Sequence, residues 1–235
     1  MTHESLSNIT NRFLNIKERV HKACLNAGRN IDNVLIIGAS KKKPAELISQ
    51  FSQQGLTDIG ENYLQEAIEK REQLLEHALN WHFIGQIQSN KTKTIAENFD
   101  WVHSVDRLKI ARRLGQQNPQ ADKPINLLVQ LNPDHEDSKG GLELDKASEL
   151  CIQIAEIEGV TIRGFMMIPK ARETYDEQCR VFSMAKEQLD LTNQRYGLTL
   201  DTLSMGMSGD LEAAIASGST MIRIGTDLFL SLIHI

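Results

Sequence analysis

The stretch Ile125-Asn-Leu-Leu-Val-Gln-Leu131 decides the fold class of this chain. It is short and almost continuously apolar, which is typical of a strand that is buried on both faces of a parallel sheet. A helical pattern over residues 144–157 follows it, and a second apolar run, Thr161-Ile-Arg-Gly-Phe-Met166, comes next. A strand, a helix and a further strand in this order indicate a βα unit of a parallel sheet.

The same alternation extends in both directions from this unit. Strands are expected at residues 34–39, 57–60, 81–84, 101–103, 125–131, 161–166, 202–204 and 220–224. Helices are expected at residues 5–28, 44–54, 62–78, 89–98, 106–117, 144–157, 173–195 and 209–217. Eight βα units in fewer than about 250 residues predict an α/β fold with a single (β/α)8 TIM barrel. An open, doubly wound parallel sheet remains the structural alternative.

No linker or change of composition divides the chain. We therefore expect residues 1–235 to form one barrel domain, with an extra N-terminal helix within residues 1–30. An acidic barrel of this size is expected to be a monomer.

The composition is that of an ordinary globular protein. Apolar residues make up 40% of the chain, the net charge is −5 and the pI is about 5.8. Nucleic-acid-binding domains are more often basic, and no run approaches the roughly 18 apolar residues of a membrane-spanning helix. The three cysteines, Cys24, Cys151 and Cys179, are odd in number and lack metal-ligand spacing, which fits a reducing compartment. The first residues lack the pattern of a signal peptide. We expect a cytoplasmic protein that binds neither nucleic acid nor membranes.

Polar residues and glycines follow most of the expected strands. TIM barrels carry their chemistry at the C-terminal ends of the strands, so these residues should gather at one end of the barrel. Lys41 follows the first strand closely, and its ammonium group could bind an anion or form a Schiff base. The alternative is that the three lysines at 41–43 form a solvated charge run.

The segments after the seventh and eighth strands have the composition of a phosphate cradle. Glycines such as Gly206, Gly209 and Gly225 let backbone N–H groups approach an anion, and TIM barrels often bind phosphate between these two loops. The alternative is that Ser208 only caps the helix expected at 209–217 and that the glycines only turn the chain.

Two histidines, His82 and His103, fall at the third and fourth strands. They could share a metal ion, but hydrogen-bonded core histidines are the more common arrangement. Neither GxxxxGK[ST] nor GxGxxG occurs in the sequence, so nucleotide binding by those loops has no support.

The strand ends also form nine co-linear motifs between Leu35 and Phe229. They are Ala39-Ser-Lys41-x-Lys-Pro44, Gly60-Glu-Asn-Tyr63, Trp81-His-Phe-Ile-Gly85, Gln88-Ser-Asn-Lys91, His103-Ser-x-Asp106, Ser138-Lys-x-Gly141, Leu203-Ser-Met-Gly-Met-Ser208, Asp210-x-Glu-Ala-Ala-Ile215 and Gly218-Ser-Thr-Met-x-Arg-Ile-Gly-Thr226. In this combination the chain resembles the YggS-type pyridoxal 5′-phosphate (PLP) homeostasis proteins.

The resemblance implies a fold like the barrel domain of bacterial alanine racemase, without that enzyme's second domain. It implies PLP held as a Schiff base on Lys41, the phosphate held by Ser208, and Arg223 facing the pyridine nitrogen. It implies no metal and no catalytic residue. The cofactor-binding residues that it implies are Lys41, Asn62, His82, Ser204, Met205, Gly206, Ser208, Arg223, Gly225 and Thr226.

The chain departs from the family pattern after Phe229. The family usually continues with Gly-Ala-Arg, whereas this chain continues Leu230-Ser-Leu-Ile-His-Ile235. We interpret residues 230–235 as an atypical tail, for which non-native sequence is one explanation.

The site that the resemblance implies is not well suited to catalysis. Arg223 stays cationic at physiological pH, so it should leave the pyridine nitrogen unprotonated and the ring a weak electron sink. The resemblance therefore implies a protein of PLP (vitamin B6) homeostasis that exchanges PLP with PLP-dependent apoenzymes and has no robust catalytic activity. One alternative is a PLP-dependent amino-acid racemase. Another is a TIM-barrel enzyme that acts on a phosphorylated metabolite, with Lys41 as an anion clamp.

Overall fold

All eight expected strands are present in the computed structural model, which describes residues 6–120, 122–135 and 140–229. They are β1 (Leu35–Ala39), β2 (Asp58–Glu61), β3 (Asn80–Phe83), β4 (Trp101–Val105), β5 (Ile125–Leu131), β6 (Val160–Met167), β7 (Thr202–Ser204) and β8 (Met221–Ile224). Neighbouring strands pair in parallel in sequence order, and β1 pairs with β8. The sheet is therefore a closed barrel, which confirms the TIM-barrel prediction and excludes the open sheet.

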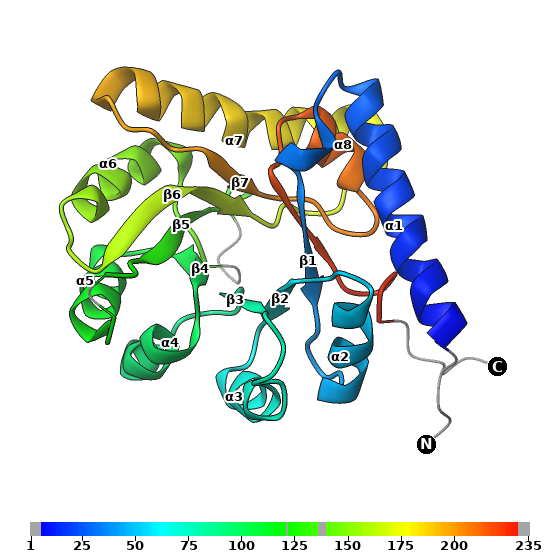
Figure 1. The fold of residues 1–235 in the computed structure, drawn as a ribbon. Coiled ribbons are helices and arrows are strands. Elements are labelled where there is room, and N and C mark those ends of the chain that lie inside the picture. The colour runs from blue at the N-terminus through cyan, green and yellow to red at the C-terminus, as the bar shows by residue number, and fades with distance from the viewer. Residues whose placement is uncertain (1–5, 121, 136–139, 230–235) are drawn as a thin grey trace.

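The helices surround this barrel (Figure 1). They are α1 (Leu6–Asn26), α2 (Ala45–Gln53), α3 (Leu64–Gln73), α4 (Thr92–Asn98), α5 (Leu108–Gln117), α6 (Leu144–Ala155), α7 (Tyr175–Tyr196) and α8 (Leu211–Ala216), with short 3-10 turns η1 (Ile31–Asn33) and η2 (Ser89–Lys91). Each helix from α2 to α8 connects two consecutive strands. None of the described helices has the length and apolarity needed to cross a bilayer.

Helix α1 is the extra N-terminal helix, and it packs against α8 and α2 (Figure 1). Its buried residues Ile9, Phe13, Ile16 and Val20 recur at three- and four-residue steps and form one apolar face. The Phe13 ring meets the ring of Phe51 from α2 edge to face, with 6.4 Å between the centroids. This face fastens α1 to the outside of the barrel.

Two predicted helices differ from the observed ones. Helix α3 ends at Gln73, several residues before the expected end, because the chain tightens there and the N–H of Leu74 donates to the carbonyl of Arg71. The helix expected at 89–98 is divided into η2 and α4. At the junction the Thr92 hydroxyl donates to the carbonyl of Ser89 (3.0 Å), a local bond that competes with regular helix hydrogen bonding.

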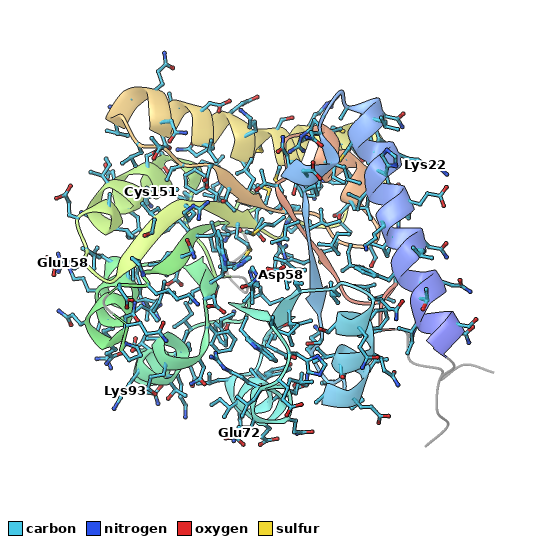
Figure 2. All side chains as sticks on the ribbon, viewed as in Figure 1. Lys22, Asp58, Glu72, Lys93, Cys151 and Glu158 are labelled. Carbon is cyan, nitrogen blue, oxygen red and sulfur yellow. The ribbon has the colours of Figure 1, made fainter. Side chains whose placement is uncertain are left out.

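The apolar core lies mainly between the strands and the surrounding helices. The inside of the barrel is different, because it contains a group of buried polar side chains: Asp58, His82, His103, Ser204 and Arg223. Figure 2 shows Asp58 among the central strands, whereas Lys22, Lys93 and Glu158 lie at the periphery. Bulky apolar side chains usually fill a TIM barrel, so this polar interior is a distinctive feature of the molecule.

Two expectations lie outside the described residues. They are the Ser138-Lys139 part of one motif and the tail at residues 230–235.

Candidate cofactor site

A cavity of about 800 Å³ opens at the C-terminal ends of the strands. Its volume falls within the range of about 300–1,000 Å³ that is typical of small-molecule and cofactor sites. Six of the ten predicted site residues line it: Lys41, Asn62, Ser208, Arg223, Gly225 and Thr226. The other lining residues are Ala39, Lys43, Ile84, Ile168, Met207, Gly209 and Phe229. The cavity therefore combines residues from the first strand loop with residues from the last two.

Lys41 lies on the cavity wall because the residues on either side of it are fixed. Ser40 is fully buried, and its backbone N–H donates to the carbonyl of Gly60 at the end of β2 (3.0 Å). Lys42 has a positive φ of 61°, and its backbone N–H donates to the side chain of Glu66. The three lysines at 41–43 are therefore distinct, since Lys41 and Lys43 line the cavity and Lys42 does not.

A buried ion pair supports this loop from below. The ammonium group of Lys70 in α3 donates to the carboxylate of Glu61 (2.6 Å) and to the carbonyl of Ser40 (2.7 Å). The Ser40 hydroxyl donates to the same Glu61 oxygen. Burial raises the pKa of Glu61, although the hydrogen bonds from Lys70 and Ser40 act in the opposite direction. Sequence reasoning missed Lys70, because it is one of several charged residues in the helix expected at 62–78.

Ser208 faces the cavity with a free hydroxyl group. Its Oγ is buried and has no hydrogen-bond partner among the described residues. The alternative in which Ser208 only caps the following helix is wrong, since α8 begins at Leu211 and its N-cap residue is Asp210. The Asp210 carboxylate accepts from the N–H of Met207 (2.6 Å) and closes the turn instead. An unsatisfied buried donor is costly unless a ligand can accept from it.

Helix α1 joins the two loops that carry this part of the cavity. The guanidinium of Arg19 donates to the carbonyl of Ser208 (2.9 Å) and to the carboxylates of Glu212 (2.9 Å) and Asp227 (2.8 Å). Ser208 and Glu212 follow β7, and Asp227 follows β8. Sequence reasoning missed Arg19, because a contact between residues so far apart leaves no local pattern.

Arg223 forms part of the cavity floor and is itself almost completely buried. Its Nη1 donates to the backbone carbonyl and the hydroxyl of Ser204 (both 2.7 Å), and its Nη2 donates to the carbonyl of Met167 (3.0 Å). Burial lowers the pKa of Arg223 to about 10, with the Asp210 carboxylate acting in the opposite direction. The guanidinium therefore remains charged at neutral pH.

The other four predicted residues lie beneath the cavity surface and do not line it. His82 is on the inner face of β3, where its Nε2 lies 2.9 Å from the carboxylate of Asp58 and its Nδ1 lies 3.0 Å from Nε2 of His103. Met205 and Gly206 bond through their backbones, to the carbonyl of Met221 and the N–H of Arg223 respectively. Ser204 contacts Arg223, as above. None of these four residues is among those that line the cavity, and their role in binding a cofactor stays a prediction.

His82 and His103 bond to each other and to neighbouring side chains rather than to a shared ion. Within residues 6–120, 122–135 and 140–229, no cluster of three or more histidine, cysteine or acidic side chains could hold a metal. The two histidines are therefore hydrogen-bonded core residues.

Comparison with known proteins points to one family. A family model described as "Alanine racemase, N-terminal domain" matches residues 39–232. The chain is 45% identical to a pyridoxal phosphate homeostasis protein of Pseudomonas aeruginosa, over 95% of this chain and 96% of the relative. It is 40% identical to the protein of the same name from Escherichia coli K12, over 95% and 97% of the two chains.

Solved structures agree with this result. The structure of PipY from Synechococcus elongatus with PLP bound is 32% identical, with a TM-score of 0.83 over 94% of this chain and 99% of that one. An alanine racemase of Clostridium difficile is 14% identical, with a TM-score of 0.73 over 97% of this chain and 58% of that one. The second likeness shows the fold alone, and the matched part of the racemase leaves out a large remainder of that enzyme.

Proposed function

We propose, from the premise that this chain belongs to the family of pyridoxal phosphate homeostasis proteins and to the alanine racemase N-terminal domain family, that it binds PLP and acts in PLP homeostasis. The observation that carries the proposal is the position of Lys41, the unpartnered Ser208 hydroxyl and the charged Arg223 around one cavity. An amine, a free donor and a guanidinium match the aldehyde, the phosphate and the ring nitrogen of PLP.

In this proposal Lys41 holds PLP as a Schiff base. When bound, PLP supplies an aldehyde that condenses with an amine, and a ring that withdraws electrons. Ser208 donates to the phosphate, together with the backbone of Gly225 and Thr226. A Cβ on Gly209 would meet nothing within 4 Å, so the backbone beside Ser208 is open to a ligand. Asn62 forms the wall on the side of β2.

Arg223 would hold the pyridine nitrogen in its unprotonated form. A pKa of about 10 keeps the guanidinium a donor at neutral pH, and a cation beside the pyridine nitrogen disfavours protonation of that nitrogen. With its nitrogen unprotonated, the PLP ring is a weak electron sink. This favours a protein that buffers or delivers PLP over one that catalyses a reaction efficiently. We propose that its partners are PLP-dependent apoenzymes and that it acts as a monomer in the cytoplasm. The unpaired cysteines, of which Cys24 and Cys151 are buried, are compatible with a reducing compartment.

The test is the absorption spectrum of the purified protein with added PLP, before and after borohydride reduction. We expect a Schiff-base band that borohydride traps on residue 41 and that Lys41→Ala abolishes. Lys42→Ala is the matched control, because its side chain is exposed and outside the cavity, and it should keep the band. No band in the wild type, or the same band in Lys41→Ala, would contradict the proposal.

A turnover assay separates the homeostasis protein from an amino-acid racemase. We expect no robust racemisation by the PLP-loaded wild type. Vigorous racemisation that Lys41→Ala abolishes would instead establish a PLP-dependent enzyme.

A further inference from the structure

The buried polar side chains inside the barrel form one continuous chain of hydrogen bonds, which we call the barrel relay. It runs from Asp58 through His82, His103 and Ser204 to Arg223. The four donor–acceptor distances are 2.9 Å, 3.0 Å, 2.9 Å and 2.7 Å in that order. His82, His103 and Ser204 are fully buried, and Asp58 is 3% exposed. The three members between the two ends of the relay are therefore shielded from bulk water.

The two ends of the relay lie at opposite ends of the barrel. Asp58 is the first residue of β2, whereas Arg223 lines the cavity beyond the C-terminal strand ends. The Asp58 carboxylate also accepts from the hydroxyl of Thr57 (2.7 Å) and the amide of Asn80 (3.2 Å). Thr57 and Asn80 are exposed, so Asp58 lies just beneath the surface on the face away from the cavity.

With both imidazoles neutral, the carboxylate of Asp58 fixes the direction of every bond in the relay. Arg223 can only donate, and an ionised carboxylate at Asp58 can only accept. Each neutral imidazole carries one N–H, and His82 must carry it at Nε2 to reach Asp58, so the Ser204 hydroxyl donates to Nδ1 of His103. Nε2 of His103 donates to Nδ1 of His82, and Nε2 of His82 donates to Asp58. Each member between the ends donates once and accepts once within the relay, with both imidazoles neutral and protonated at Nε2.

A second proton on the histidine pair would disrupt this arrangement. It would force both histidines to donate toward Ser204, whose hydroxyl hydrogen has no other acceptor among the described hydrogen bonds. It would also place a second cation close to buried Arg223. Burial holds the pKa of His103 well below its usual value, a proton on His82 would lower it further, and the charge on Arg223 acts in the same direction. The Trp101 ring stacks on His82, with 5.7 Å between the centroids, and adds no charge.

We propose that Asp58 is a positioning residue for the cavity at the opposite end of the barrel, because it sets the direction of the barrel relay and so the orientation of the Ser204 hydroxyl against Arg223. Asp58 touches no part of the cavity, and its influence passes only through the relay. The consequence for the cofactor rests on the proposed function, whereas the relay itself exists without PLP.

The relay is tested first in the protein without PLP. Nitrogen-15 NMR of the histidine side chains distinguishes the two tautomers. We expect His82 and His103 of the wild type to be neutral and protonated at Nε2. In Asp58→Asn the amide can donate or accept, so the direction is no longer imposed, and both histidines should become mixtures of tautomers. Asp201→Asn is the matched control, since it removes a carboxylate beside the start of β7 that has no contact with the relay.

The response of His103 decides this test, because it contacts neither Asp58 nor the neighbours of Asp58 outside the relay. An unchanged His103 spectrum in Asp58→Asn, or a doubly protonated histidine in the wild type at neutral pH, would overturn the proposal. If Asp58→Asn does not fold, Ser204→Ala interrupts the relay from the other end. Because Asp58 still fixes the other end, both histidines should keep the Nε2 tautomer in this variant, and a change in the tautomer of His82 would overturn the proposal.

The consequence at the cavity is tested with PLP. We expect Asp58→Asn to keep the Schiff-base band but to shift its absorption maximum and to weaken PLP binding about three- to tenfold, the range for one perturbed hydrogen bond. A changed His103 tautomer with unchanged PLP spectrum and affinity would overturn the role of Asp58 at the cavity. Absence of a PLP band in the wild type would contradict the proposed function and leave the NMR result on the relay standing.

Discussion

Ser208 is a residue at which stability and binding should respond differently to the same substitution. Its hydroxyl has no partner in the described structure, so Ser208→Ala should leave the free energy of unfolding unchanged or slightly raised. A hydrogen bond to a charged group contributes roughly 1.5–3 kcal/mol, so PLP affinity should fall about 10- to 100-fold. Thermal unfolding without PLP and titration with PLP measure the two effects.

Ser219→Ala is the matched control for this prediction. The Ser219 hydroxyl is buried, but it donates to backbone carbonyls such as that of Met205 (2.6 Å). This variant should lose stability and retain PLP affinity. A Ser208→Ala protein that is clearly destabilised without PLP would show that its hydroxyl has a structural partner.

Lys70 is a second residue for which we make a prediction, because it forms a buried ion pair that the sequence does not reveal. Lys70→Met leaves the Glu61 carboxylate buried without its partner, which should cost about 3–5 kcal/mol of unfolding free energy. Urea denaturation measures the loss. Lys22→Met breaks an exposed pair with Glu18 on the surface of α1, where Figure 2 shows Lys22, and should change stability little. Equal effects of the two variants would contradict the importance of burial.

The residues of the site differ in how far the sequence predicts them. Lys41, Ser208 and Arg223 were predictable, because each lies in a motif at the end of a strand. The position of His82 was not, because alternation along a strand tells which side a residue faces but not how deep it lies in the barrel. Lys70 and Arg19 act through contacts distant in sequence, and no local pattern encodes those contacts.

At the scale of elements, α1 does more than cover the barrel. Its Arg19 binds groups on the loops after both β7 and β8, and so fixes the two halves of the proposed phosphate site relative to each other. We expect Arg19→Ala to weaken PLP binding several-fold. Arg19→Lys should not restore it, since one ammonium group lacks the planar fork that reaches several acceptors at once.

Titration with PLP measures this effect, and Lys22→Ala on the same helix is the control. Unchanged affinity in Arg19→Ala would show that the two loops hold their positions without α1.

The elements themselves were largely predictable. Strands β1, β5 and β8 are short, mostly apolar runs next to polar or glycine residues, and that pattern can be recognised without tertiary information. The ends of α3 and the division between η2 and α4 were not predictable, because local hydrogen bonds such as that of Thr92 decide them. Eight consecutive strands are enough to predict the barrel, but its polar interior required the three-dimensional structure.

At the scale of the whole molecule, the polar interior should make stability depend on pH. Burial raises the pKa of Asp58, but hydrogen bonds from His82, Thr57 and Asn80 outweigh it, and the pKa lies below the usual 3.8. An acid with a lowered pKa stabilises the fold fully above its unfolded value, and this contribution is lost as the pH falls through its folded value.

We therefore expect the difference in unfolding free energy between the wild type and Asp58→Asn to be largest at pH 5 and above. It should shrink as the pH falls below about 3.8, where the carboxyl becomes protonated. Urea unfolding at a series of pH values measures the difference. A difference that stays constant across this window would show that the Asp58 charge does not contribute to stability.

The pairing of β1 with β8 has a consequence for synthesis on the ribosome. Lys41 leaves the exit tunnel early, whereas Ser208 and Arg223 are among the last of the described residues to emerge. Lys41 comes close to Ser208 and Arg223 only when β1 pairs with β8. A nascent or truncated chain that lacks β8 therefore contains Lys41 without the rest of the cavity. A small molecule can therefore bind at this site only after the whole barrel has been synthesised, and its retention shows that the barrel has closed.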